Sequence, residues 1–357
     1  MVVYHLWRST MLHCGIIGCG RICPNHFVTL NQHPDVAIRW LCDLQVHNTA
    51  PFANSLSNVR TTPSADDVFK DPSVDFVNIL TDHASHYLLA KQALLAGKHV
   101  IVEKPFTIEP EHARELVALA TANRLKIICI SQHRFDPMIN QIRALVQKGK
   151  LGTLLQINGR LLCGRSTEYY SESYWHGRSA IDGGSALINQ GYHMLDIILS
   201  MAGIPAKLNA YAARRAHVDL IETEDTISLQ CVFNNGALGS LNITSGYAKE
   251  EWNAEIEMVG TDGRIVFDLH SPHQPPVIDV QGVNFSEIMQ TVTRTYQKVG
   301  IGYYGDLHDL QIKDFISSLI EDRSPAFLPQ HAVDTVTVIH QAYASAHRNG
   351  FAWGSIS

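Results

Sequence analysis

The stretch from Leu12 to Cys23 reads LHCGIIGCGRIC, a short apolar run that leads into a glycine turn and then into a helical pattern. Gly18 and Gly20 supply the first two glycines of a G-x-G-x-x-G motif, one for the tight turn and one that lets backbone approach a pyrophosphate. Cys23 occupies the third position, where a small residue lets the helix pack on the strand, so it is a mild departure. The stretch predicts the strand, turn and helix that open a dinucleotide-binding domain.

An acidic residue follows the second predicted strand, at Asp43. A carboxylate at that place can bind the ribose hydroxyls of the adenosine half of NAD. The same carboxylate would repel a 2′-phosphate, and Leu44 and Gln45 offer no cation to receive one. We therefore expect NAD rather than NADP. The alternative is that the glycines form only a tight turn and that Asp43 is only a loop acid.

The residues around this motif alternate between strand-like and helix-like patterns. Such alternation predicts a doubly wound parallel sheet, because parallel neighbours need crossover connections. The expected strands are 12–17, 36–42, 74–80, 99–103 and 125–130, and the expected helices are 21–32, 83–96 and 110–123.

The pattern changes after about residue 150, where strand-like stretches follow one another with turn signals such as Asn234-Asn235-Gly236 between them. This predicts an α+β domain with a mostly antiparallel sheet and helices on one face. We place the domains at 11–133 and 134–357. The expected strands are 153–162, 207–215, 226–233, 237–244, 252–259 and 263–268, and the closing helices are 306–321 and 331–347.

Composition limits the function classes. The 357 residues carry a net charge of −6 and show no Lys/Arg cluster, which argues against nucleic acid or an anionic membrane as partner. Only 17% of the residues are charged, which hints that a partner chain covers part of the surface. The seven cysteines form no CxxC pair, so we expect reduced thiols in a cytoplasm. No apolar run is long enough for a membrane span, and we expect residues 1–10 to be a loose arm or an artefact of the assigned start.

Three further segments carry a family resemblance. They are GKHVIVEKP at 97–105, SQHRFDP at 131–137 and DGGSALINQGYHMLD at 182–196. Together with the glycine turn they resemble the glucose–fructose oxidoreductase / inositol dehydrogenase / MocA (Gfo/Idh/MocA) family, over nearly the whole chain from Met11. The resemblance implies a Rossmann domain followed by an α+β domain with a large open sheet. In the family that sheet commonly mediates assembly, so we expect a homodimer or homotetramer.

Lys104 ends the fifth predicted strand, at the carboxyl edge of the sheet where ligands bind in such folds. Pro105 disfavours helix at Lys104 and so holds this side chain on a turn. A cation there can hydrogen-bond a substrate hydroxyl and stabilise the alkoxide that forms as hydride leaves. From position alone a solvated surface lysine is an equal alternative. The resemblance favours a catalytic role.

His193 lies four residues after Asn189, so both are expected on the same side of a helix. An imidazole can take a hydroxyl proton near neutral pH, which is the task of a general base in alcohol oxidation. A single histidine among 19 is more often structural, and His193 stands out only through its segment. In inositol dehydrogenases of the family the position of Asn189 is typically Asp. The Asn here can position His193 or a substrate oxygen, and it favours a sugar carried on a nucleotide.

The remaining site predictions rest on position and on the resemblance. Arg134 could contact substrate or form a structural salt bridge, and the loop with Tyr174, Trp175 and Arg178 could stack on a ring and bind a diphosphate. We predict no metal site, because the pairs His83/His86 and His270/His273 lack a recognisable third ligand. The expected cofactor-binding residues are Gly18, Gly20, Arg21, Ile22, Asp43, Thr81, His86, Glu103, Lys104 and Gln132. The expected substrate-binding residues are Lys104, Arg134, Tyr174, Trp175, Arg178, Asn189 and His193.

These observations predict an NAD-dependent dehydrogenase that oxidises a secondary ring hydroxyl of a sugar to a ketone. The resemblance suggests C3 of a UDP-linked N-acetylhexosamine (UDP-GlcNAc) or of its uronic acid, on a route to an amino sugar. One alternative is a dehydrogenase for a free polyol or monosaccharide of the inositol or glucose type. A second alternative is a regulator that binds NAD or a sugar without turnover, although such proteins usually lose the lysine or the histidine.

Overall fold

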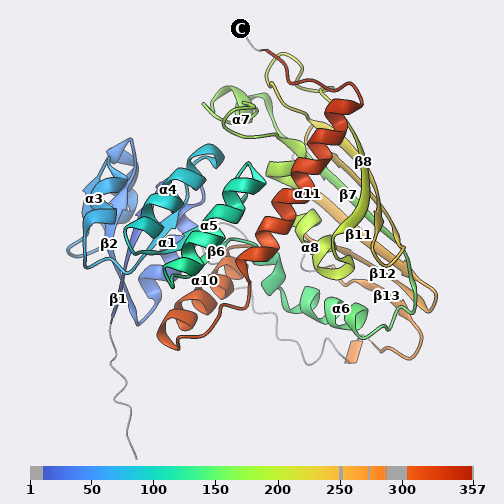
Figure 1. The fold of residues 1–357 in the computed structure, drawn as a ribbon, viewed down its shortest axis with the longest axis horizontal. Helices are drawn as coiled ribbons and strands as arrows, with labels where there is room; N and C mark the ends of the chain where they lie inside the picture. The colour runs from blue at the N-terminus through green and yellow to red at the C-terminus, as the bar shows by residue number, and fades with distance from the viewer. Residues whose placement is uncertain (1–10, 249–251, 272–273, 285, 288–303, 356–357) are drawn as a thin grey trace, which may run out of the picture.

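The N-terminal part of the chain forms a parallel sheet of strand order β3-β2-β1-β4-β5-β6 (Figure 1). The strand order reverses at β1, and such a switch point opens a crevice at the carboxyl ends of the strands. The computed structural model describes residues 11–248, 252–271, 274–284, 286–287 and 304–355, so the segment 1–10 and His273 lie outside it. The strands are β1 (Leu12–Ile17), β2 (Val36–Cys42), β3 (Arg60–Thr62), β4 (Phe76–Ile79), β5 (His99–Val102) and β6 (Ile127–Cys129).

Helices cover both faces of this sheet because successive strand residues point to opposite sides. Ile16 and Phe76 belong to one buried cluster, whereas Ile17 and Val77 belong to the other. Both faces are therefore apolar, as expected for a parallel sheet. The helices of this part are α1 (Cys23–Gln32), α2 (Ala50–Ala53), α3 (Ala65–Lys70), α4 (His83–Leu95) and α5 (Pro110–Ala122).

The second sheet has the order β13-β12-β11-β7-β10-β9-β8 and is antiparallel except for the pair β7 and β10. Along β7 the buried Ile157 and Leu161 alternate with the exposed Arg160, so one face is covered and the other is open. In Figure 1 the helices lie on one side of this sheet only. Its strands are β7 (Leu154–Cys163), β8 (Pro205–Ala213), β9 (Thr226–Phe233), β10 (Leu238–Thr244), β11 (Trp252–Gly260), β12 (Gly263–Asp268) and β13 (Val277–Val280).

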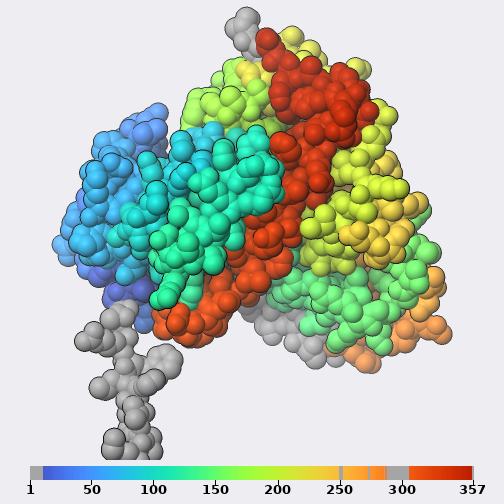
Figure 2. Space-filling model, in the orientation of Figure 1, coloured from blue at the N-terminus to red at the C-terminus, as the bar shows by residue number. Residues whose placement is uncertain are grey.

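The helices of the second part connect the two sheets. Helix α10 (Tyr304–Ile320) returns to the first sheet, where Phe315 packs against Phe76 with their ring centroids 5.9 Å apart. Helix α11 (Pro329–Arg348) packs against α5 on one side and β8 on the other, and Figure 2 shows its surface between those of the two sheets. The other helices are α6 (Pro137–Gln147), α7 (Thr167–Ser171) and α8 (Tyr192–Ala202). No helix in the described ranges combines the length and apolar character that a membrane span needs.

The predicted fold class is confirmed, and several local predictions are corrected. Six elements were not predicted, most of them too short to show a clear periodicity: β3, β13, α2, α3, α6 and α7. Asn189 and His193 were expected on one α-helix. Instead, a single π-helical turn spans Ala186–Gly191 and α8 begins at Tyr192. All seven cysteines are buried and unpaired.

Candidate active site

The turn between β1 and α1 has the shape that a dinucleotide needs. Gly18 has φ +94°, and a side chain there would lie 2.7 Å from the Leu80 carbonyl oxygen. Gly20 is exposed, and a side chain there would meet nothing within 4 Å, so backbone borders open space. No side chain caps α1 at Ile22, which leaves its amino end free to face an anion. The turn therefore fits a bound pyrophosphate, with Arg21 exposed beside it.

Asp43 connects the end of β2 to this turn. Its Oδ2 accepts a hydrogen bond from the Cys19 backbone N–H at 2.9 Å, and its Oδ1 accepts from the Gln45 N–H and from Asn48 Nδ2. These bonds hold the carboxylate at the carboxyl edge, beside the glycine turn. The side chain is only half-buried, so it can still face a ribose. This is the place that the sequence predicted for it.

Thr81 and His86 border the same cleft in different ways. A side chain at Gly18 would approach Thr81 Cγ2 to 3.1 Å, so Thr81 lies directly against the glycine turn. His86 is fully buried, and its ring nitrogens lie 2.8 Å from the Pro105 carbonyl oxygen and 3.2 Å from that of Thr81. Burial lowers the pKa of His86 to about 4. His86 thus holds two loops together from the interior of the protein. This is a structural role, whereas the sequence predicted that His86 binds the cofactor.

Lys104 lies where β5 ends, at the centre of the carboxyl edge. Its Nζ donates to the backbone oxygen of Asn189 at 2.9 Å and to Asn189 Oδ1 at 3.1 Å. Burial lowers the pKa of the Lys104 ammonium from its usual value, and the carboxylates of Glu103 and Asp182 oppose this. Lys104 is therefore fixed between the two domains rather than free in solvent.

Asn189 holds Lys104, a contact that the sequence did not predict; of its two predicted roles, positioning His193 or a substrate oxygen, no hydrogen bond within the described residues supports the first. Its Oδ1 accepts from Lys104, and its Nδ2 donates to Asp182 Oδ1 at 3.1 Å. Asp182 is fully buried, and burial raises the pKa of its carboxyl to about 7. His83 Nδ1 lies 3.2 Å from the same carboxylate. The π-helical turn is the physical reason for the difference, since it rotates Asn189 away from the register of a continuous α-helix.

His193 is buried in the first turn of α8 and its nearest polar neighbour is Gln132. The two Nε2 atoms are 3.2 Å apart, and neither His193 Nδ1 nor Gln132 Oε1 has a hydrogen-bond partner within the described residues. Burial, with the neighbouring His133 and Lys104, lowers the pKa of His193 well below its usual value. The imidazole is thus neutral near pH 7, the state in which a histidine can take a proton. Because an amide nitrogen only donates, His193 Nε2 accepts from Gln132 in this arrangement and Nδ1 carries the ring proton, so a substrate hydroxyl would replace Gln132 at Nε2.

A buried His–Glu–His group lies behind Lys104, and no motif in the sequence predicted it. Glu103 Oε1 lies 3.0 Å from His26 Nε2 and 3.2 Å from His308 Nε2. Burial alone would raise the pKa of Glu103, yet hydrogen bonds from the two imidazoles bring it well below its usual value. The three ligand atoms are close enough to hold one metal ion. Because both nitrogens meet a single carboxylate oxygen at hydrogen-bond distance, we interpret the group as a hydrogen-bond network.

The predicted substrate-binding residues outside the Lys104 and His193 centre differ in where they lie. Arg134 forms a buried, two-pronged ion pair with Asp196, at 2.8 and 2.7 Å, so it is the structural salt bridge that the sequence left open. Tyr174 donates from its hydroxyl to Asp82 Oδ2 at 2.8 Å and is 68% exposed. The remaining two side chains lie in the same loop: Trp175 packs on His83, and Arg178 lies 3.6 Å from Glu222. The loop thus reaches across to the first domain beside the cofactor cleft.

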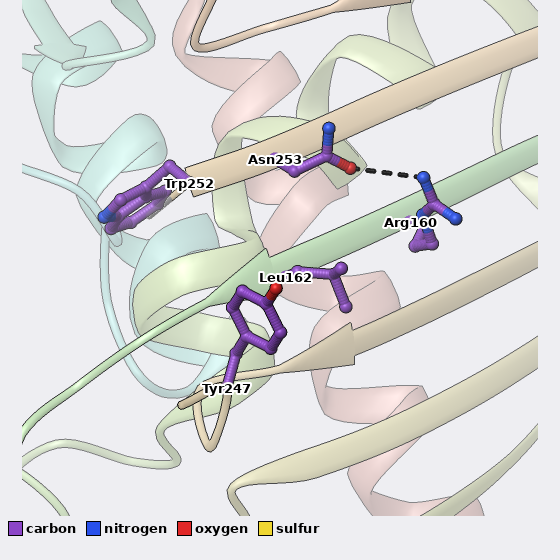
Figure 3. Close-up of a pocket in the computed structure, with 5 residues that line it drawn as sticks. All are labelled: Arg160, Leu162, Tyr247, Trp252 and Asn253. Atoms are coloured by element: carbon purple, nitrogen blue, oxygen red, sulfur yellow. Dashed lines mark hydrogen bonds between the residues drawn. The ribbon is translucent and has the colours of Figure 1, made fainter. Parts of the chain in front are cut away.

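Arg165 and Gln190 are the polar residues that sequence reasoning missed. Arg165 Nη2 donates to Gln190 Oε1 at 2.7 Å, and its guanidinium lies 4.5 Å from the Tyr169 ring centre and 4.7 Å from that of Trp252. Trp252 also lines a shallow hollow of about 510 Å³ on the second sheet (Figure 3). The hollow is lined by Arg160, Leu162, Tyr247, Trp252 and Asn253, and neither Lys104 nor His193 is among its lining residues.

Comparison with known proteins agrees with this geometry. The oxidoreductase family model with an NAD-binding Rossmann fold matches residues 12–130, and the GFO/IDH/MocA C-terminal domain model matches residues 139–266. The chain belongs to the Gfo/Idh/MocA oxidoreductase family. It is therefore an NAD-dependent oxidoreductase, which argues against the non-catalytic alternative.

Three proteins to which this chain is similar show the range of sequence identity. The uncharacterized oxidoreductase YhhX of Escherichia coli is 31% identical over 246 residues, which cover 68% of this chain and 67% of that protein. Levoglucosan dehydrogenase of Pseudarthrobacter phenanthrenivorans is 24% identical and covers 79% of both chains. The WlbA dehydrogenase of Bordetella pertussis, solved with NADH and UDP-GlcNAcA, superposes with a TM-score of 0.84 at 22% identity and covers 98% of this chain and 99% of that one.

Proposed function

We propose that this oxidoreductase converts a secondary ring hydroxyl of a sugar to a ketone, at a centre formed by Lys104 and His193. One observation carries the proposal: an ammonium held by Asn189 and a neutral, incompletely hydrogen-bonded imidazole both lie at the carboxyl edge of the NAD-binding sheet. A hydroxyl bound there would find one group that stabilises negative charge on oxygen and another that accepts a proton.

The residues of the chain divide the reaction between them. Lys104 donates a hydrogen bond to the substrate oxygen and so favours the alkoxide that develops on it. His193 takes the hydroxyl proton, which its neutral state at pH 7 allows. Gln132, 3.2 Å from His193, orients the ring, and Asn189 keeps Lys104 in place. When bound, NAD supplies the acceptor for the hydride that leaves the carbon.

As substrate we propose a UDP-linked N-acetylhexosamine or its uronic acid, oxidised at C3 on a route to an amino sugar. Support comes from the structural similarity to a dehydrogenase solved with UDP-GlcNAcA, and from an Asn rather than an Asp at position 189. The exposed Tyr174 and the half-buried Trp175 and Arg178 provide rings and a cation on the loop beside the cleft. A free monosaccharide or polyol is the second candidate, favoured by the similarity to levoglucosan dehydrogenase.

A substrate panel separates these candidates. NADH formation would be followed with UDP-GlcNAc, its uronic acid, free N-acetylglucosamine, levoglucosan, myo-inositol and glucose. Each assay would be run with and without 2-oxoglutarate, which could reoxidise a cofactor that the enzyme retains. Turnover with nucleotide-linked sugars alone supports the first candidate, and turnover with a free sugar or polyol supports the second. No turnover in any assay, for a protein that binds NADH, would contradict the proposed function.

We further propose that the open face of the second sheet pairs two or four copies of the chain in the cytoplasm. Tyr211 and Leu238 lie on this face and are 60% and 55% exposed. Large exposed apolar side chains on a sheet face are a common feature of interfaces. The molar mass in solution, measured by light scattering, tests the pairing. A monomer would contradict it.

A further inference from the structure

Arg165 is a cation close to the reaction centre that no carboxylate neutralises. Within the described residues no acidic oxygen lies within 4 Å of its guanidinium, and its Nε is buried without a hydrogen-bond partner. Arg39, the other arginine with a buried unpartnered Nε, hydrogen-bonds the His13 side chain on the far side of the first domain. A guanidinium that lacks an acidic partner retains donors for an anion from outside.

Arg165 is also held in a fixed position. The rings of Tyr169 and Trp252 lie 4.5 and 4.7 Å from its central carbon, and Gln190 accepts from Nη2 at 2.7 Å. Gln190 is itself fixed, because its Nε2 donates to the Tyr169 hydroxyl at 3.1 Å. Such a guanidinium loses little conformational entropy when it binds a ligand, so its remaining donors are preorganised.

Two consecutive residues connect Arg165 to the catalytic lysine. Asn189 accepts from Lys104 and Gln190 accepts from Arg165, so one π-helical turn anchors two cations at the same site. Arg165 is close enough to oppose the charge on Lys104, and the acid nearest to Lys104 on the substrate side, Asp182, has its pKa raised to about 7. This part of the site therefore carries excess positive charge, which an anionic ligand would balance.

A row of rings continues from Arg165 toward His193. Trp252 contacts His270 at 4.6 Å between ring centroids, His270 contacts His133 at 5.3 Å, and His133 contacts His193 at 5.0 Å. The row joins the cation to the general base through side chains that are in contact, so Arg165 and His193 belong to one packed cluster beside Lys104.

We propose that Arg165 binds an anionic substituent of the substrate, and that the enzyme acts on acidic sugars of the uronate type. This inference rests on the proposed function and narrows its substrate class. A guanidinium edge matches two oxygens of a carboxylate or of a phosphate, so either anionic group could bind Arg165 in the same way. A carboxylate on the oxidised ring fits better, because one π-helical turn holds Arg165, through Gln190, next to the lysine that contacts the reacting hydroxyl.

The test measures dissociation constants on the enzyme–NADH complex for ligand pairs that differ by one acidic group. The pairs are UDP-GlcNAcA with UDP-GlcNAc, glucuronate with glucose, and glucose 6-phosphate with glucose. In the wild type we expect the carboxylates to bind at least about tenfold more tightly than their neutral partners, as a charge-assisted bond implies. Preference for glucose 6-phosphate alone would overturn the carboxylate assignment and identify a phosphate site.

Arg165→Gln should bring the acidic-to-neutral ratio toward one. Arg160→Gln is the matched control. Arg160 lies on β7, five residues before Arg165, but on the open face of the sheet, where it donates a hydrogen bond to Asn253. A ratio is independent of the fraction of folded protein, so partial misfolding cannot imitate the effect. Equal ratios in wild type and Arg165→Gln, or no binding of any acid, would overturn the inference. The dissociation constants are measured without NADH formation. A lack of turnover would therefore contradict the proposed function and not the assignment of Arg165.

Discussion

Glu103 and Lys104 are consecutive residues, yet they belong to two polar networks of opposite character. Glu103 turns into the first domain, where His26 and His308 satisfy it in a fully buried group. Lys104 turns toward the second domain, where it donates to Asn189. Around this pair lie the incompletely hydrogen-bonded His193 and Asp182, whose carboxyl has its pKa raised to about 7. A closed network stabilises the fold, whereas an incompletely satisfied one is available for a substrate. The predictions below test this division.

Replacement of Lys104 should have the largest effect, and it should fall on turnover. Lys104→Met keeps the length of the side chain but removes the charge that stabilises the substrate oxygen. We expect kcat to fall about a thousandfold, the upper range for one lost oxyanion donor. NADH affinity, measured by fluorescence titration, and the urea midpoint serve as controls and should change little. Turnover within tenfold of wild type would show that Lys104 is not catalytic.

Replacement of Glu103 should instead lower stability. Glu103→Gln keeps the shape but removes the negative charge to which His26 and His308 donate. We expect the free energy of unfolding to fall by about 3 kcal/mol, as for one broken partner of a buried charged pair. Urea unfolding measures this loss. A loss below about 1 kcal/mol would show that the Glu103 network does not stabilise the fold.

His193→Gln should reduce turnover by about a hundredfold, which is within the range for loss of a general base. The reason is that glutamine can fill the space beside Gln132 but cannot take the proton. His133→Gln is the control, because its ring adjoins His193 at 5.0 Å and is equally buried. We expect the control to lose less than tenfold in steady-state kcat. Equal losses would indicate a packing role for both histidines.

Asp182→Asn should have the smallest effect, a change in pH dependence. Above its pKa of about 7 the Asp182 carboxylate raises the pKa of Lys104, so its removal lets the ammonium deprotonate at lower pH. The basic limb of the kcat/KM profile should therefore move to lower pH by about one unit or less, the range for a single nearby charge. Glu222→Gln, which removes a carboxylate beside Arg178, should leave that limb in place. A shift of the limb to higher pH would show that the Asp182 carboxylate does not raise the pKa of Lys104.

The sequence predicted the elements that support the site better than the contacts within it. Gly18, Gly20 and Asp43 lie where the motif placed them, because a tight turn between a strand and a helix is a local property. The contact of Asn189 with Lys104 was not predicted, because one extra residue in a helical turn changes which side chains share a face. Arg165 carried no signal, since an arginine after a strand is usually solvated.

The sequence by itself determined the two-domain architecture, the NAD-binding turn and the segments that carry Lys104 and His193. The architecture and the turn follow from periodicity and glycine spacing, and the two segments follow from their resemblance to motifs of the family. Only the tertiary structure decided that Lys104 meets Asn189 85 residues away and that Glu103 meets His308 205 residues away. It also placed Arg165 between two rings, with no acidic partner among the residues that the structure describes. Such pairings depend on how helices and sheets pack, and packing brings together side chains whose separation along the chain carries no local pattern.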